Sequence, residues 1–116
     1  MQIEAGGCCG ALPFHLNEHD ETRAIARRNI DAWWPYIERG AEAIVVTASG
    51  CGVMVKEYGH LMADDSLYAK KAAKLAQLAR DPIEVVDAVW EPLSMKVVPT
   101  TGATSLAFHS PCTLQH

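Results

Sequence analysis

The sequence predicts a small α/β domain with a parallel sheet, layered in a Rossmann-like manner with helices on both faces. Short apolar runs at residues 43–46 and 105–108 alternate with longer stretches that carry apolar residues at helical spacing. The chain of 116 residues is near the usual size of one domain, and 49% of it is hydrophobic. It can therefore bury a core of its own.

The first half of the chain is expected to hold a strand end and one long helix. Residues 1–5 are predicted to end a strand that enters a glycine-rich turn. Asn17 is a good N-cap residue for the helix that follows, with acidic residues in the first turn. Pro35 should kink or restart this helix because proline lacks the amide donor, and Gly40 should cap its end. Its apolar stripe consists of Ala26, Ile30, Trp33, Trp34 and Ile37.

The middle of the chain is expected to hold a buried strand and two helices. Residues 43–46 form a run that is too short for a helix and rich in β-branched residues, so a buried strand is predicted. A short helix is expected over residues 53–58. Asp65 or Ser66 should cap a second helix that ends near Leu78, where alanines raise the helix propensity.

The last third of the chain begins with a predicted helical turn that opens at Pro82. Residues 92–104 contain two prolines, a glycine and three threonines, and are expected to form a connection. Residues 105–108 are predicted to form the last strand.

Composition excludes several classes of function. Ten basic and fourteen acidic residues give a net charge of −4, so nucleic acid is not an expected partner. No apolar run approaches the roughly 20 residues that cross a bilayer. The first residues lack the basic and apolar regions of a signal peptide. We therefore expect a cytoplasmic protein with reduced thiols.

Four cysteines give the strongest indication of chemistry. Cys8 and Cys9 are adjacent, where a disulfide would be strained, but two neighbouring thiolates can present soft ligands to one metal centre. Cys51 and Cys112 follow the two predicted strands. Because ligands bind at the carboxyl ends of parallel strands, we expect Cys8, Cys9 and Cys51 to converge at one sheet edge, with Cys112 further along it.

Other interpretations of these residues remain open. The adjacent cysteines can instead be packed as small hydrophobic residues or act as redox thiols without a cluster. Zinc held by Cys8, Cys9, Cys51 and one histidine is a further alternative, although no C-x-x-C spacing is present in the sequence. His15 and His109 lie near the cysteines and are weaker candidates for a metal or substrate site.

The segments that carry the cysteines resemble a known family. Cys-Cys-Gly at 8–10, Ser-Gly-Cys-Gly at 49–52 and His-Ser-Pro-Cys at 109–112 are similar to the CCG cysteine-rich domain. This domain occurs in heterodisulfide reductase B-like proteins, which include glycolate oxidase iron–sulfur subunits. The resemblance implies that residues 1–116 form part of such a domain, from the end of a first repeat through a connection to the start of a second.

The resemblance also implies roles for individual residues. Cys8 and Cys9 match the double cysteine of the first repeat, and Cys51 matches the last cysteine of its C-x-x-C motif. Ala48 stands where the other cysteine of that motif is found. Cys112 matches the leading cysteine of the second repeat. The implied cofactor-binding residues are thus Cys8, Cys9, Cys51 and Cys112, with the first three as metal ligands of the first repeat.

The implied function is electron transfer. An iron–sulfur cluster of the 4Fe–4S kind would relay electrons from flavin-containing glycolate oxidase subunits, in which glycolate is oxidised to glyoxylate. No catalytic residue is implied in this chain, and the complex would associate peripherally with the inner face of the membrane. With an incomplete ligand set, the isolated chain is expected to hold no cluster and to be inactive alone. A cluster-free thiol or protein-interaction module is the alternative.

Overall fold

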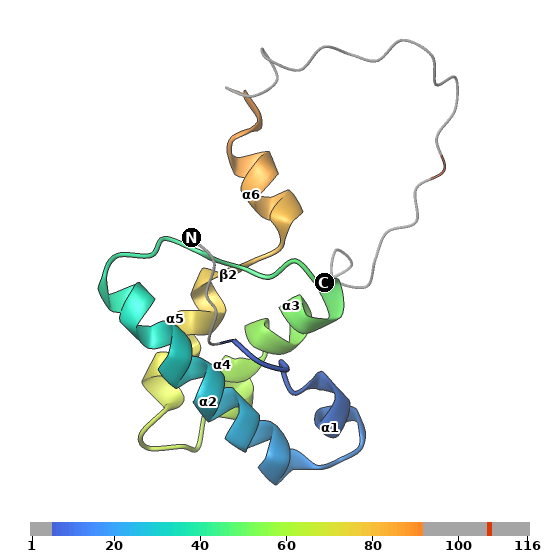
Figure 1. The fold of residues 1–116 in the computed structure, drawn as a ribbon, viewed down its shortest axis with the longest axis vertical. Helices are drawn as coiled ribbons and strands as arrows, with labels where there is room; N and C mark the ends of the chain where they lie inside the picture. Colours follow the sequence, from blue (N-terminus) through green and yellow to red (C-terminus); the bar gives the residue numbers. More distant parts are fainter. Residues whose placement is uncertain (1–5, 92–106, 108–116) are drawn as a thin grey trace.

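Helices and two short strands follow one another in the computed structural model, which describes residues 6–91 and 107 (Figure 1). β1 and β2 pair in parallel, with Ile44 opposite Ala79 and Val45 opposite Arg80, which confirms the predicted parallel sheet. Over the described residues this sheet has two strands and most of the chain is helical, so Rossmann-like layering is not shown. The elements in chain order are α1 (Ala11–His15), α2 (His19–Glu38), β1 (Ile44–Val45), α3 (Ser49–Lys56), α4 (Tyr58–Leu61), α5 (Ala69–Leu78), β2 (Ala79–Arg80) and α6 (Pro82–Ala88).

The long helix α2 differs from its prediction at two places. Its N-cap is Glu18 and not Asn17, because Asn17 has a positive φ of 65° and lies in the turn that leaves α1. The helix also continues through Pro35. Pro35 lies one turn from the end of α2, so a single missing amide donor does not interrupt the hydrogen-bond ladder. The acidic residues of the first turn, Asp20 and Glu21, lie where the helix dipole favours negative charge.

The C-terminal end of α2 confirms the predicted role of Gly40. This glycine has a φ of 94°, in the left-handed region that residues with a Cβ rarely adopt. Its amide donates to the Ile37 carbonyl at 3.0 Å, and the Ala41 amide donates to the Tyr36 carbonyl at 3.0 Å. These two bonds make a Schellman motif, which satisfies carbonyls that the helix leaves unpaired.

The segment after β1 also starts differently from its prediction. The strand predicted at 43–46 is present, but Ile44 is buried and Val45 is exposed, so one face of β1 contacts the core. Helix α3 begins at Ser49, four residues before the helix predicted over residues 53–58, and Cys51 therefore lies in the first helical turn. The extended backbone of Ala48 allows the helix to begin directly after the strand region.

The later elements agree more closely with the sequence. The N-cap of α5 is Tyr68, without a side-chain capping bond, so neither Asp65 nor Ser66 caps this helix as predicted. The Asp65 carboxylate instead accepts hydrogen bonds from the amides of Leu67 and Tyr68 in the turn before α5. Asp81 and Glu84 form a capping box around Pro82 at the start of α6. β2 was not predicted. The strands predicted at 1–5 and 105–108 fall outside the described residues, apart from Ala107.

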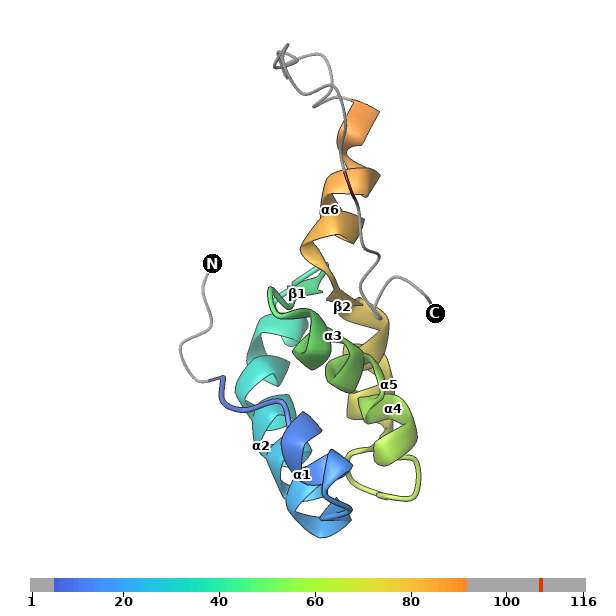
Figure 2. The ribbon, with the colours of Figure 1, turned by 90° about the vertical axis from the view of Figure 1, so that its right-hand side faces the viewer.

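The core lies between α2, α3 and α5, and the short strands close one end of it (Figures 1 and 2). Figure 2 shows that α6 extends away from this body, and none of its residues is buried. The salt bridge from Lys56 to Glu84, at 2.7 Å, ties α6 back to α3. The buried hydrophobic residues are Cys9, Ala26, Ile30, Trp33, Ile44, Met54, Val55, Tyr58, Met62, Ala72, Leu75 and Ala79.

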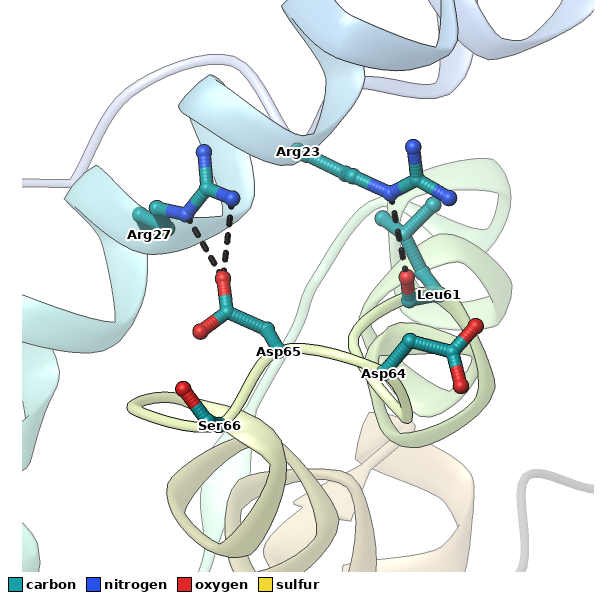
Figure 3. Close-up of a pocket in the computed structure, with 6 residues that line it drawn as sticks. All are labelled: Arg23, Arg27, Leu61, Asp64, Asp65 and Ser66. Atoms are coloured by element: carbon teal, nitrogen blue, oxygen red, sulfur yellow. Dashed lines mark hydrogen bonds and ion pairs between the residues drawn. The ribbon is translucent and has the colours of Figure 1, made fainter.

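An ion pair joins α2 to the loop between α4 and α5 (Figure 3). Two nitrogens of the Arg27 guanidinium contact one carboxylate oxygen of Asp65, at 2.9 and 2.8 Å. Arg23, one turn earlier on the helix, donates to the Leu61 carbonyl at 3.5 Å. These side chains line an open, polar cavity of about 430 Å³. The bonds made by Arg27 and Arg23 hold the loop against α2.

Within the described part of the chain, no helix is long and apolar enough to cross a membrane.

Candidate functional site

The double cysteine lies in a tight turn that leads into α1. Gly10 ends this turn with a φ of 89°, again in the left-handed region. A Cβ added at Gly10 would lie 3.3 Å from Cγ2 of Ile25 and 3.4 Å from Cγ2 of Thr22, both on α2. Gly10 is thus required both by the conformation of the turn and by its close approach to the helix.

The turn separates the two adjacent thiols. Cys9 is buried, with 6% of its surface exposed, whereas Cys8 is exposed. The Cys9 thiol is hydrogen bonded to the thiol of Cys51, which is half-buried in the first turn of α3. The structure thus brings Cys9 and Cys51 together from separate segments, while the Cys8 side chain faces solvent.

Cys9 and Cys51 line one cavity of about 490 Å³. Trp33 of α2 and Val55 of α3 form apolar parts of its wall, and the rest comes from Gly7 and from residues 43–48 in and around β1. The site is thus at the end of β1 where the chain enters α3. Ligands commonly bind at this place in parallel sheets.

Burial determines the protonation of Cys9. The pKa of its thiol is raised to about 11, mainly by loss of hydration and also by the hydrogen bond to Cys51 and the neighbouring cysteine charges. The Ala11 amide donates to the Cys9 sulfur and opposes it. Without a metal, Cys9 is therefore a neutral thiol at pH 7, and a metal ion must displace a proton in order to bind it.

A buried chain of hydrogen bonds holds the backbone of both cysteines. Nδ2 of Asn29 donates to the Cys8 carbonyl at 2.9 Å and lies 2.9 Å from the Tyr58 hydroxyl. That hydroxyl donates to the Cys9 carbonyl at 2.7 Å. Both side chains are fully buried, and burial raises the pKa of Tyr58 to about 12, so the phenol stays protonated. Asn29 and Tyr58 thus connect two helices to the double cysteine.

Sequence reasoning did not identify Asn29 or Tyr58. A signal for Asn29 is present, because this polar residue occurs on the stripe formed by Ala26, Ile30 and Trp33, where apolar residues are expected. A buried polar residue at such a place needs hydrogen-bond partners. The pattern contains no comparable signal for Tyr58, since tyrosine is common in ordinary cores.

Of the other candidates, only His15 is among the described residues. His15 is exposed at the end of α1 and does not line the cavity that contains Cys9. Cys112 and His109 fall outside the described residues. Among the residues that the structure describes, no three or more His, Cys, Asp and Glu side chains are arranged to hold a metal ion.

The donor chemistry nonetheless fits part of an iron–sulfur site. Cys9 and Cys51 are soft sulfur ligands beside a cavity, with Cys8 next in the chain. A cubane cluster takes about four cysteine thiolates. The described residues thus bring together two thiols of the kind that such a cluster requires, which is fewer than a complete ligand set.

Comparisons with known proteins find a family match that includes the double cysteine and Cys51. Residues 1–56, which contain the double cysteine turn, β1 and α3, match the family described as cysteine-rich domain (CCG). The chain is 53% identical over all of its 116 residues to the glycolate oxidase iron-sulfur subunit of Escherichia coli strain K12, and this match covers 28% of that protein.

More distant relatives match shorter parts. The probable glycolate oxidase iron-sulfur subunit of Bacillus subtilis strain 168 is 35% identical over 74 residues, covering 64% of this chain and 16% of the relative. Lactate utilization protein A of an Exiguobacterium species is 32% identical over 87 residues, covering 69% of this chain and 34% of the relative. The chain thus spans about a third or less of the length of these curated relatives. No solved structure matches it.

Proposed function

Because the chain is a homologue of the iron–sulfur subunit of glycolate oxidase, we propose that it forms part of the cysteine-rich electron-transfer domain of such a subunit. In this proposal residues 1–116 comprise the end of a first CCG repeat, a connection and the start of a second repeat. The complete domain would have the layered α/β architecture predicted from the sequence. The relatives are much longer than this chain, so the remaining parts of the domain would lie in the intact protein.

The observation that carries the proposal is the contact between Cys9 and Cys51. Two soft sulfur donors from separate segments lie beside one cavity, which supports a shared metal site there. We assign Cys9 and Cys51 as thiolate ligands of an iron–sulfur cluster in the intact protein. Cys8 and Cys112 are the further candidates, and the additional thiolates would come from other parts of the protein.

The chain's own residues would control the environment of the cluster. When bound, an iron–sulfur cluster supplies one-electron transfer without a chemical change in the protein. Trp33 and Val55 form apolar walls of the cavity and limit the access of water. The Ala11 amide donates to the Cys9 sulfur, and hydrogen bonds to the ligand sulfurs tune the potential of such a site.

The physiological reaction would take place in partner subunits. We propose that flavin-containing subunits oxidise glycolate to glyoxylate and that this protein relays the electrons onward. The similarity to lactate utilization protein A is consistent with a short 2-hydroxy acid as the substrate class, because glycolate and lactate differ by one methyl group. Peripheral association with the inner face of the membrane would occur through the assembled complex.

A cluster-free thiol or interaction module is a second candidate. It is favoured by the packing of Cys9 within the hydrophobic core, with Cys51 packed against that core. In this case Cys9 and Cys51 would be a packed thiol pair, and Cys8 would be an exposed surface residue.

Iron content separates the two candidates. We expect Cys9→Ser in the intact protein to lower iron and acid-labile sulfide and to slow glycolate-dependent dye reduction, because a hard hydroxyl replaces a soft ligand. Ala72→Ser is a matched control, since it buries a hydroxyl in α5 away from the cavity at a cost of about 1–3 kcal/mol. Wild-type iron and dye reduction in Cys9→Ser would rule out the ligand role and favour the cluster-free module.

A further inference from the structure

We propose that Asn29 and Tyr58 are positioning residues that fix the peptide units of Cys8 and Cys9, and through them the direction of the cysteine sulfurs at the cluster site. This inference rests on the proposed function for its cluster, but its geometry concerns this chain alone. Neither side chain contacts a thiol in the hydrogen bonds described above, so both act through the backbone.

Two consecutive backbone carbonyls, those of Cys8 and Cys9, accept hydrogen bonds from buried side chains. Asn29 from α2 holds the Cys8 carbonyl, and Tyr58 from the start of α4 holds the Cys9 carbonyl. The contact between Asn29 and the Tyr58 hydroxyl couples the two bonds. All of these donors are buried, so water does not compete with the bonds.

The planar trans peptide fixes the direction of the amides that follow these carbonyls. The described residues contain no cis peptide bond, so the carbonyl and the following amide of each unit point in opposite directions. With the carbonyls of Cys8 and Cys9 turned toward Asn29 and Tyr58, the amides of Cys9 and Gly10 are turned away from this pair. The same constraint separates the two thiols, placing Cys9 in the cavity with Cys51 and leaving Cys8 exposed.

Asn29 is a polar residue on the buried stripe of α2. Oδ1 of Asn29 is buried without a hydrogen-bond partner, which costs stability. An apolar residue at this position would avoid that cost. The amide is thus explained by its two donated contacts, which both lead to the double cysteine.

The test uses Tyr58→Phe in the full-length protein, with Tyr68→Phe as the matched control. Tyr68→Phe removes the same hydroxyl group, but from an exposed bond to Asp31 at 2.8 Å. In metal-free protein, the alkylation of each cysteine by iodoacetamide is followed by mass spectrometry. We expect Cys9 to react about tenfold faster in Tyr58→Phe than in wild type, because one buried hydrogen bond is lost. The rate at Cys51 should stay within about twofold of wild type in this variant. Tyr68→Phe should change neither rate.

The iron-loaded protein gives a second measurement. We expect Tyr58→Phe to release iron to a chelator about 10–100-fold faster, the usual effect of losing a group that orients a metal ligand. The electron paramagnetic resonance signal should also change, which a general loss of stability would not produce. Asn29→Ala should act in the same way, and Asn29→Ser, which replaces the amide donor with a hydroxyl donor, should restore part of the wild-type behaviour. The Asn29 pair also provides the test if Tyr58→Phe does not fold.

The outcomes separate the two proposals. Equal acceleration at all cysteines, or none in Tyr58→Phe, would overturn the positioning role. Wild-type protein without iron would overturn the proposed function, and the alkylation rates would still decide whether Asn29 and Tyr58 position the cysteines. Normal iron in wild type with an unchanged signal and release rate in Tyr58→Phe would overturn the positioning role alone.

Discussion

Substitution of Gly10 by alanine should destabilise the turn that presents Cys9. The φ of 89° costs a residue with a Cβ about 1–2 kcal/mol. The new Cβ would also lie 3.3 Å from Cγ2 of Ile25, closer than ordinary contact, and 3.4 Å from Cγ2 of Thr22, so the Ile25 side chain must move slightly. We therefore expect Gly10→Ala to lower the free energy of unfolding by about 2–3 kcal/mol, with the conformational part the larger.

Two other glycines separate these contributions. Gly40 has a φ of 94° and no atom within 4 Å of an added Cβ, so Gly40→Ala should show the conformational cost alone. Gly50 lies in α3 without a positive φ and also has open space, so Gly50→Ala should be neutral or stabilising by up to about 1 kcal/mol.

Urea unfolding of the three variants, followed by tryptophan fluorescence and circular dichroism, gives the required free energies. The expected order of stability is Gly50→Ala, then Gly40→Ala, then Gly10→Ala. The reasoning is refuted if Gly10→Ala is as stable as Gly50→Ala, and the crowding contribution is refuted if Gly10→Ala and Gly40→Ala are equally stable.

Two further variants test the packing and the charge interactions of the fold. Ile30→Ala removes a side chain that is fully buried in α2 and should cost about 2–5 kcal/mol in urea unfolding, whereas Leu67→Ala, at a residue 79% exposed, should change it by less than about 0.5 kcal/mol. The hydrogen bond from Arg27 lowers the pKa of Asp65 in the folded protein. The ionised Asp65 therefore stabilises the fold fully above the unfolded-state pKa of about 4, and this contribution is lost as the pH falls through the lower folded-state pKa. Asp65→Asn should therefore be less stable than wild type at pH 7, and this difference should disappear in acid; a difference that persists below the folded-state pKa would contradict the ion pair as its cause.

The sequence was most informative where local chemistry decides the structure. Gly40 ends α2 through its own backbone freedom, and Asp81 with Pro82 begins α6 through its own capping bonds. The sequence was less informative where distant residues decide. β2 has two residues, Ala79 and Arg80, and is a strand only because β1 lies beside it.

The candidate site was predictable in the same uneven way. The adjacent cysteines and Cys51 could be recognised from their glycine-rich surroundings. Which of the two adjacent thiols faces Cys51 depends on the carbonyl bonds made by Asn29 and Tyr58, which come from distant segments. The sequence marks Asn29 as a polar residue on an apolar stripe, but it does not show which carbonyl Asn29 or Tyr58 binds, so the separation of Cys8 from Cys9 required the structure.

The most direct test of the central claim is the iron content of the intact protein with Cys9→Ser, Cys51→Ser and both changes together. If the two thiols hold one cluster, each single variant should lose iron and the double variant should lose no more than the worse single variant, because residues that act as one site are not additive. Independent, additive losses would place the two cysteines in separate sites, and undiminished iron in all three variants would contradict the cluster assignment.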